Sequence, residues 1–108
     1  MQHWFFLASA IVLEVAGTTA MKLSGGFTRI LPSVLLFVFY AASFAALTLA
    51  LKKIDVGVAY AVWSGVGTAL IAAIGILYFR EPATALKFFS IFLIILGIVG
   101  LLFSGSKH

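Results

Sequence analysis

The chain has no cysteine and few charged residues, and each shortage excludes classes of protein. Without cysteine there is no disulfide, no thiolate nucleophile and no cysteine-based metal site. Only 9% of the 108 residues are charged, whereas soluble domains carry roughly 25%. The formal net charge is +4, but the cations are spread along the chain and form no clustered footprint for nucleic acid. We therefore expect a membrane protein that binds no nucleic acid and needs no cofactor or metal.

Four long apolar stretches make up most of the sequence. Clusters of charge separate them, and about 18 to 23 residues between clusters are enough for a helix to cross a hydrocarbon core of about 30 Å. The predicted spans are residues 4–21, 31–51, 56–79 and 86–104. The linkers are short, so successive helices should be antiparallel neighbours. The first span lacks a basic region before it, so we expect it to be retained rather than cleaved as a signal peptide. The prediction is a multi-pass, all-α membrane protein with one domain over 1–108.

The charges of the loops say little about how the chain is oriented in the membrane. Lys52, Lys53 and Lys107 fall on one side of the predicted topology, and Lys22, Arg29, Arg80 and Lys87 fall on the other. The positive-inside rule depends on asymmetry in this count, and three against four is nearly balanced. Either other signals set the orientation or the chain inserts both ways, which would permit an antiparallel homodimer. Four helices are also few to enclose a transport pathway, so a cavity for an organic ion forms more readily between two copies.

Glu14 is the only charged residue between the loop clusters, and it lies near the middle of the first span. An unpaired carboxylate at bilayer depth costs several kcal/mol. Since the apolar stretches offer it no cation, its partner should come from outside, as a proton or a cationic substrate. Removal from water favours the protonated form of a carboxyl group, and a second copy nearby favours it further. Proton and substrate would then compete for Glu14, which by itself gives exchange. The alternative is a permanently protonated Glu14 that donates a hydrogen bond between helices.

Several residues share the helix face of Glu14 and are candidates to line a substrate pocket. They are Leu7, Ala10, Ile11, Gly17 and Thr18. Ala10, Gly17 and Thr18 are small, which predicts open space beside the carboxylate. Small residues equally permit close packing of helices, and both interpretations can hold at once.

The third span carries an aromatic pair and two glycines. Tyr60 and Trp63 are three residues apart, so they share a helix face. Aromatic rings attract cations most strongly once water is removed, which makes both residues pocket candidates, although Tyr and Trp also mark membrane interfaces. Gly65 and Gly67 weaken the helix and predict a bend, or else allow close helix contact.

The second and fourth spans supply further candidates. Tyr40 and Ser43 share a face and could add a phenol and a hydroxyl to the pocket. Ser90 and Gly97 are seven residues apart on the fourth span, a small-residue stripe that predicts a dimer contact.

Together these residues resemble the small multidrug resistance family of bacterial transporters. The resemblance covers nearly the whole chain and is strongest in Leu-Glu-Val-Ala-Gly-Thr-Thr-Ala-Met-Lys at 13–22 and in 26–29, 32–33 and 57–67. It implies an antiparallel homodimer in the bacterial inner membrane that exports organic cations in exchange for protons. It also implies the site roles given above: Glu14 for proton and substrate; Tyr40, Ser43, Tyr60 and Trp63 in the pocket; Gly65 and Gly67 at a bend; and the fourth helix as dimer contact.

Some positions distinguish branches of that family. The guanidinium-exporting branch usually has Trp where this chain has Gly17, so the segment looks like the multidrug, quaternary-ammonium branch. Ile54-Asp55-Val56 has some likeness to a branch of paired heterodimers that often handle polyamines, but the balanced charges fit a homodimer better. Ser90 stands where glycine is common, a mild departure.

The sequence therefore predicts a proton-coupled antiporter for lipophilic, aromatic or quaternary-ammonium cations. Guanidinium or polyamine export, and a non-transporting membrane subunit, are the alternatives. An enzyme is not expected, because no span places a second polar group to act with Glu14.

Overall fold

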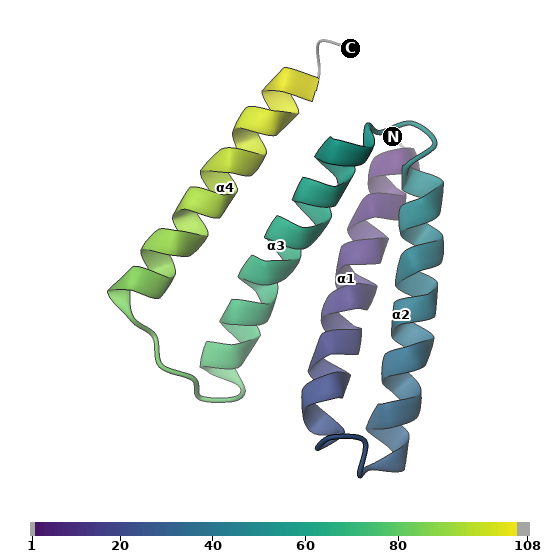
Figure 1. Cartoon of the computed structure of the whole chain (residues 1–108), viewed down its shortest axis with the longest axis vertical. Coiled ribbons are helices and arrows are strands. Elements are labelled where there is room, and N and C mark those ends of the chain that lie inside the picture. The colour runs from purple at the N-terminus through teal and green to yellow at the C-terminus, as the bar shows by residue number, and fades with distance from the viewer. Residues whose placement is uncertain (1, 106–108) are drawn as a thin grey trace. The chain divides into compact units, whose positions relative to one another are not determined.

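A computed structural model describes residues 2–105 and folds them into four α-helices (Figure 1). They are α1 (Gln2–Leu23), α2 (Ile30–Ala50), α3 (Val56–Leu77) and α4 (Ala85–Gly105). Residues 2–105 contain no strand, and all four helices are long and apolar enough to cross a membrane. The predicted all-α fold of four membrane spans is thus confirmed, with helix ends that differ from the expected ones by at most two residues. Lys107, which entered the charge balance, lies outside the described residues.

The helices form two compact units, α1 with α2 up to Ile54 and α3 with α4 from Asp55 onward. Within each unit the two helices lie side by side and run in opposite directions, as the short connections require (Figure 1). That all of 1–108 forms a single domain stays a prediction.

The loop between α1 and α2 is built around Ser24, which is buried. Its hydroxyl donates to the Met21 carbonyl at 2.7 Å, and its own carbonyl accepts from the Thr28 amide at 2.9 Å. Gly25 and Gly26 have φ of 58° and 72°, the left-handed region that a residue with a Cβ rarely adopts. The glycines thus allow a tight reversal, and this reversal sets how α2 lies along α1.

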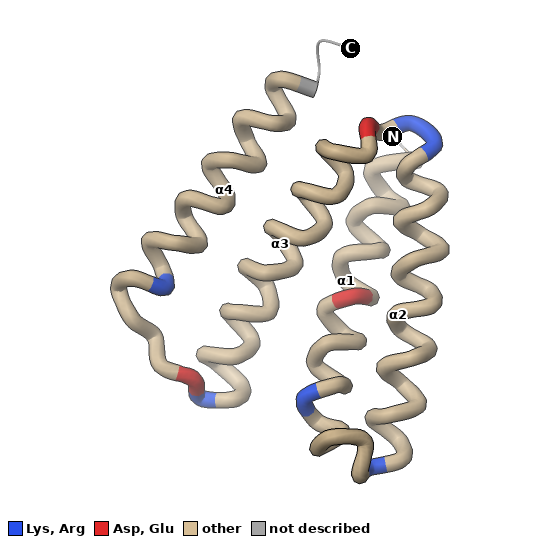
Figure 2. The backbone as a smooth tube through the Cα atoms, in the orientation of Figure 1, with Lys and Arg blue, Asp and Glu red and all other residues tan. Residues whose placement is uncertain are grey.

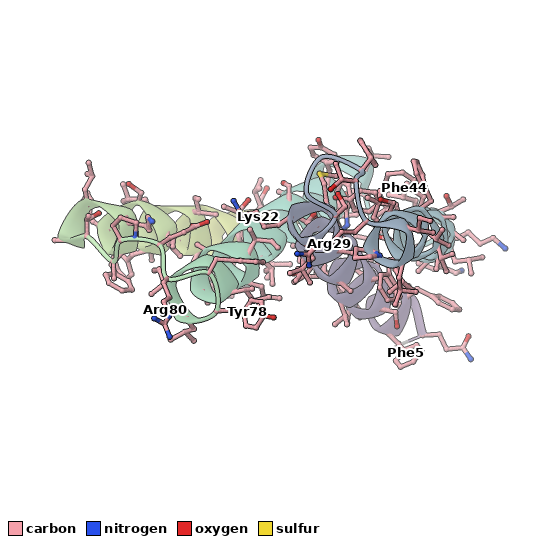
Figure 3. All side chains as sticks on the ribbon, turned by 90° about the horizontal axis from the view of Figure 1, so that it is seen from below. Phe5, Lys22, Arg29, Phe44, Tyr78 and Arg80 are labelled. Carbon is pink, nitrogen blue, oxygen red and sulfur yellow. The ribbon has the colours of Figure 1, made fainter. Side chains whose placement is uncertain are left out.

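The α1–α2 unit buries small and aliphatic side chains and turns its phenylalanines outward. The buried residues are Leu7, Ala10, Ile11, Val15, Gly17 and Ala20 on α1 and Leu36, Ser43 and Ala50 on α2. Phe5 projects away from the helix pair in the end-on view of Figure 3 and is exposed, as Phe37 is. Outward-facing apolar side chains are what a lipid environment favours.

In the α3–α4 unit, Gly65 lets the helices approach closely. A Cβ at this position would overlap the Ile98 side chain and come within 3.0 Å of Ile94 Cγ2. Helix α3 runs unbroken from Val56 to Leu77, so Gly65 supports the alternative of close helix contact. Gly67 is also buried, and a bend at the two glycines stays a prediction.

Candidate functional site

Glu14 lies in the middle of α1, and its side chain is half-buried. The other charged residues that the structure describes lie in the loops or near helix ends, whereas this one acidic position interrupts the apolar length of α1 (Figure 2). A partly exposed carboxylate keeps a route by which a proton or a cation can reach it. The structure shows this position and half-burial, and the role of Glu14 in binding proton and substrate stays a prediction.

A short chain of hydrogen bonds joins Glu14 to the neighbouring helix. Thr18, one turn further along α1, donates from Oγ1 to Glu14 Oε2 at 2.8 Å. The same Thr18 Oγ1 lies 2.6 Å from the Tyr40 hydroxyl on α2. The sequence placed Thr18 and Glu14 on one face, but the bond to Tyr40 was not foreseen. Thr18 thus stands between the carboxylate and the phenol.

The direction of this chain depends on the protonation of Glu14. A threonine hydroxyl has one hydrogen to donate and an oxygen that accepts. When Thr18 donates to an ionised Glu14, Tyr40 must donate to Thr18. When Glu14 carries a proton it can donate to Thr18 instead, and the Thr18 hydrogen then turns toward Tyr40. Thr18 thereby stabilises a charge at Glu14, because it donates to the carboxylate while its own oxygen accepts from Tyr40.

Gly17 makes this arrangement possible, because the Tyr40 ring packs on it. A Cβ at Gly17 would stand 2.7 Å from Tyr40 Cδ1 and 2.8 Å from Cε1, much closer than packed carbons approach. We expected open space beside the carboxylate at this position, and the ring fills it instead. The alternative reading of close helix packing is thus the one that the structure supports at Gly17.

Ser43 on α2 and Ala10 on α1 form a second contact between the two helices, about one turn before Glu14 on α1. The Ser43 side chain is fully buried, and its hydroxyl donates to the Ala10 carbonyl at 2.6 Å. Ala10 is 0% exposed, and Leu7 and Ile11 are buried as well. These residues pack within the folded chain, so the prediction that Leu7, Ala10, Ile11 and Ser43 line a substrate pocket stays a prediction.

The aromatic pair lies on α3. The Tyr60 and Trp63 rings have centroids 5.5 Å apart and planes inclined at 56°. Tyr60 is exposed and Trp63 is half-buried. The shared helix face that the spacing predicted is thus observed, and the role of the two rings in binding a cation stays a prediction.

The predicted dimer stripe on α4 is open in the single chain. Ser90 and Gly97 are exposed, and the described residues place no neighbouring side chain within 4 Å of a Cβ built on Gly97. Of the α4 side chains that the structure describes, only Ile98 is buried. A helix with this much free apolar surface is suited to contact with lipid or another chain.

The described residues include no group of three His, Cys, Asp or Glu side chains that could hold a metal ion. The α1–α2 site offers one carboxylate, the Thr18 hydroxyl that donates to it, and the Tyr40 hydroxyl bonded to Thr18.

Comparison with known proteins identifies the family. The profile of the Small Multidrug Resistance protein family matches residues 2–94. The uncharacterized membrane protein YvaE of Bacillus subtilis is 57% identical over 99 positions, covering 92% of this chain and 83% of YvaE. The quaternary ammonium compound-resistance protein QacE of Escherichia coli is 46% identical over the full length of both chains. The multidrug resistance protein EbrB of Bacillus subtilis is 46% identical over 92% of this chain and 85% of its own. The match over most of the chain, together with the four apolar helices, shows that this protein belongs to the small multidrug resistance family.

Proposed function

We propose that this protein exports lipophilic, aromatic or quaternary-ammonium cations across the bacterial inner membrane in exchange for protons. Proton and substrate compete for Glu14, and the Glu14 residues of two antiparallel protomers serve one pathway. The resistance named in QacE and EbrB supports export of drugs and quaternary ammonium compounds. The protein is then a transporter and not an enzyme.

The observation that carries the proposal is the lone acid of α1. Glu14 is half-buried, accepts a hydrogen bond from the neutral Thr18, and lies among apolar residues, with the nearest cation in the sequence, Lys22, about two turns further along α1. A carboxylate in such a place is costly when ionised and unpaired. A proton or an organic cation lowers that cost, but the two cannot occupy one carboxylate together. Release of one on arrival of the other is the exchange.

The aromatic pair of α3 supports an organic cation as the substrate. Tyr60 and Trp63 offer π faces, and a desolvated cation–π contact contributes ~2 kcal/mol or more. An inorganic cation would gain more from oxygen ligands, which the spans offer sparingly. Gly17 stands where the guanidinium-exporting branch usually has Trp, and its packing against the Tyr40 ring leaves no room for such a side chain, which favours the quaternary-ammonium branch.

Transport assays in vesicles test the role of Glu14. With an imposed proton gradient, the wild-type protein should accumulate a quaternary-ammonium dye, and Glu14→Gln should not. Glu81→Gln is the matched control, because it removes an acid from the exposed loop before α4 and should leave uptake unchanged. Proton-driven uptake by Glu14→Gln at the wild-type rate would exclude the proposed mechanism.

Binding titrations test the substrate class. Tetraphenylphosphonium should bind more tightly as the pH rises, because proton competition falls, and guanidinium should bind weakly at every pH. Tight guanidinium binding would favour a guanidinium exporter, and no binding of any cation would favour a non-transporting subunit.

A further inference from the structure

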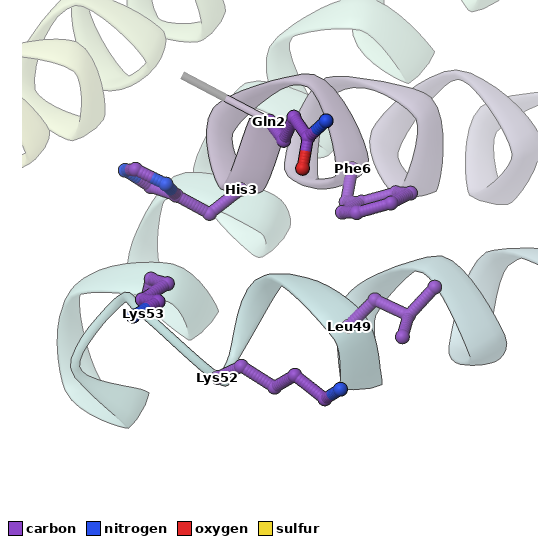
Figure 4. Close-up of a pocket in the computed structure, with 6 residues that line it drawn as sticks. All are labelled: Gln2, His3, Phe6, Leu49, Lys52 and Lys53. Carbon is purple, nitrogen blue, oxygen red and sulfur yellow. The ribbon is translucent and has the colours of Figure 1, made fainter.

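A groove at the end of the α1–α2 unit, away from its connecting loop, combines cations with apolar side chains. Its volume is about 600 Å³, and its lining residues are Gln2, His3, Phe6, Leu49, Lys52 and Lys53 (Figure 4). These residues come from the start of α1 and from the end of α2 with the turn that follows it. Their mutual placement is fixed within one compact unit.

The rim of the groove is positively charged. Lys52 and Lys53 lie in the turn after α2 and are exposed, and His3 lies opposite on the first turn of α1. Among the lining residues that the structure describes, none is acidic. The two ammonium groups and an imidazole that can donate thus favour an anionic ligand with several acceptor oxygens.

The inner wall of the groove is apolar. Phe6 and Leu49 point toward one another across the gap, and each lies about one turn further into its span than the cations of the rim (Figure 4). Phe6 is half-buried, and Leu49 is 40% exposed. The groove is thus charged at the helix end and apolar deeper in the span. A phospholipid has the same order of groups, from its phosphate to its acyl chains.

We propose that this groove binds the headgroup of an anionic phospholipid. The phosphodiester lies among Lys52, Lys53 and His3, and the upper carbons of an acyl chain lie against Phe6 and Leu49. Basic pockets at the ends of transmembrane helices bind lipid headgroups by this combination of charge and depth. A free phosphate shares the headgroup chemistry, but it would leave the apolar wall without a ligand.

Trp4 provides a local probe of occupancy. It follows His3 on α1, their rings lie 5.9 Å apart, and the Trp4 side chain is partly exposed. The chain has two tryptophans, so Trp63→Phe leaves Trp4 as the only indole. The assay measures quenching of Trp4 fluorescence in phosphatidylcholine vesicles that contain lipid brominated high in its acyl chains. Brominated phosphatidylglycerol should quench Trp4 more than the same fraction of brominated phosphatidylcholine.

The double variant Lys52→Gln, Lys53→Gln should remove that preference, with a fall of about fivefold in relative affinity for each lysine at low salt. The matched control is Lys22→Gln, Arg29→Gln, which removes two exposed cations from the opposite end of the same helix pair and should keep the preference. Unchanged quenching by brominated phosphatidylcholine shows in each variant that α1 is still inserted.

Three outcomes would overturn the proposal. The first is equal quenching by the two lipids in the wild-type background, and the second is a preference that survives loss of both lysines. The third is loss of the preference on adding millimolar glycerol phosphate but not sodium chloride of the same ionic strength, because a soluble phosphate would then be the ligand. None of these results depends on transport, so they leave the proposed function untouched.

Discussion

Replacing Thr18 with valine removes the hydroxyl between Glu14 and Tyr40 while keeping the shape of the side chain. In the wild type Thr18 donates to Glu14 at 2.8 Å and lies 2.6 Å from the Tyr40 hydroxyl. Both protonation states of Glu14 can use this hydroxyl, the ionised state as acceptor and the protonated state as donor. The bond to the ionised state is the stronger one, so its loss disfavours the charge and makes the proton a better competitor.

The size of the effect follows from that difference. A hydrogen bond to a charged group contributes about 1.5–3 kcal/mol and a neutral one about 0.5–1.5 kcal/mol. The ionised form should therefore lose about 1 kcal/mol more than the protonated form. Since ~1.4 kcal/mol corresponds to one pH unit, a difference of about 1 kcal/mol should raise the pH midpoint of cation binding by about 0.7 unit. Affinity at alkaline pH, where competition from protons vanishes, should return to the wild-type value.

Tetraphenylphosphonium binding, measured across pH with purified protein, tests this shift. Thr18→Ser retains the hydroxyl and should keep the wild-type midpoint. Thr19→Val is the matched control, because the Thr19 hydroxyl donates to the Val15 carbonyl of its own helix at 2.9 Å and not to Glu14. A Thr18→Val curve that superimposes on the wild type, or that moves to lower pH, would refute the reasoning.

Two glycines give opposite predictions. Gly17→Ala should lower the stability of the α1–α2 unit by about 1–3 kcal/mol, the usual range for overpacking, because the new Cβ displaces the Tyr40 ring. Thermal unfolding in detergent measures this loss. An unfolding temperature equal to that of the wild type would contradict the close packing at Gly17. Gly97→Leu should leave unfolding of the single chain unchanged, since the described neighbours leave room for it. It should weaken the proposed dimer in cross-linking assays, and an undiminished dimer would remove Gly97 from the interface.

The sequence alone was enough to predict the four spans, and it drew attention to Glu14 as a candidate site residue. Uninterrupted apolar length decides whether a helix can cross a bilayer, and one acid within such a length stands out without any knowledge of its neighbours. Helical spacing also placed Gly17 and Thr18 on the face of Glu14, and it paired Tyr60 with Trp63, whose rings do lie close together. These are properties of one helix at a time, which local geometry determines.

Contacts between helices needed the tertiary structure. The position of α2 along α1 decides whether Tyr40 contacts Thr18 and whether the Tyr40 ring covers Gly17. It also decides which carbonyl accepts the hydrogen bond from Ser43. The same position brings His3 opposite Lys52 and Lys53. No periodicity within a single helix encodes that position, because it results from the reversal at Gly25 and Gly26 together with the packing of many side chains at once. The sequence by itself therefore determined which carboxylate lies within the apolar spans, and only the folded helix pair decided which hydroxyls are linked to it.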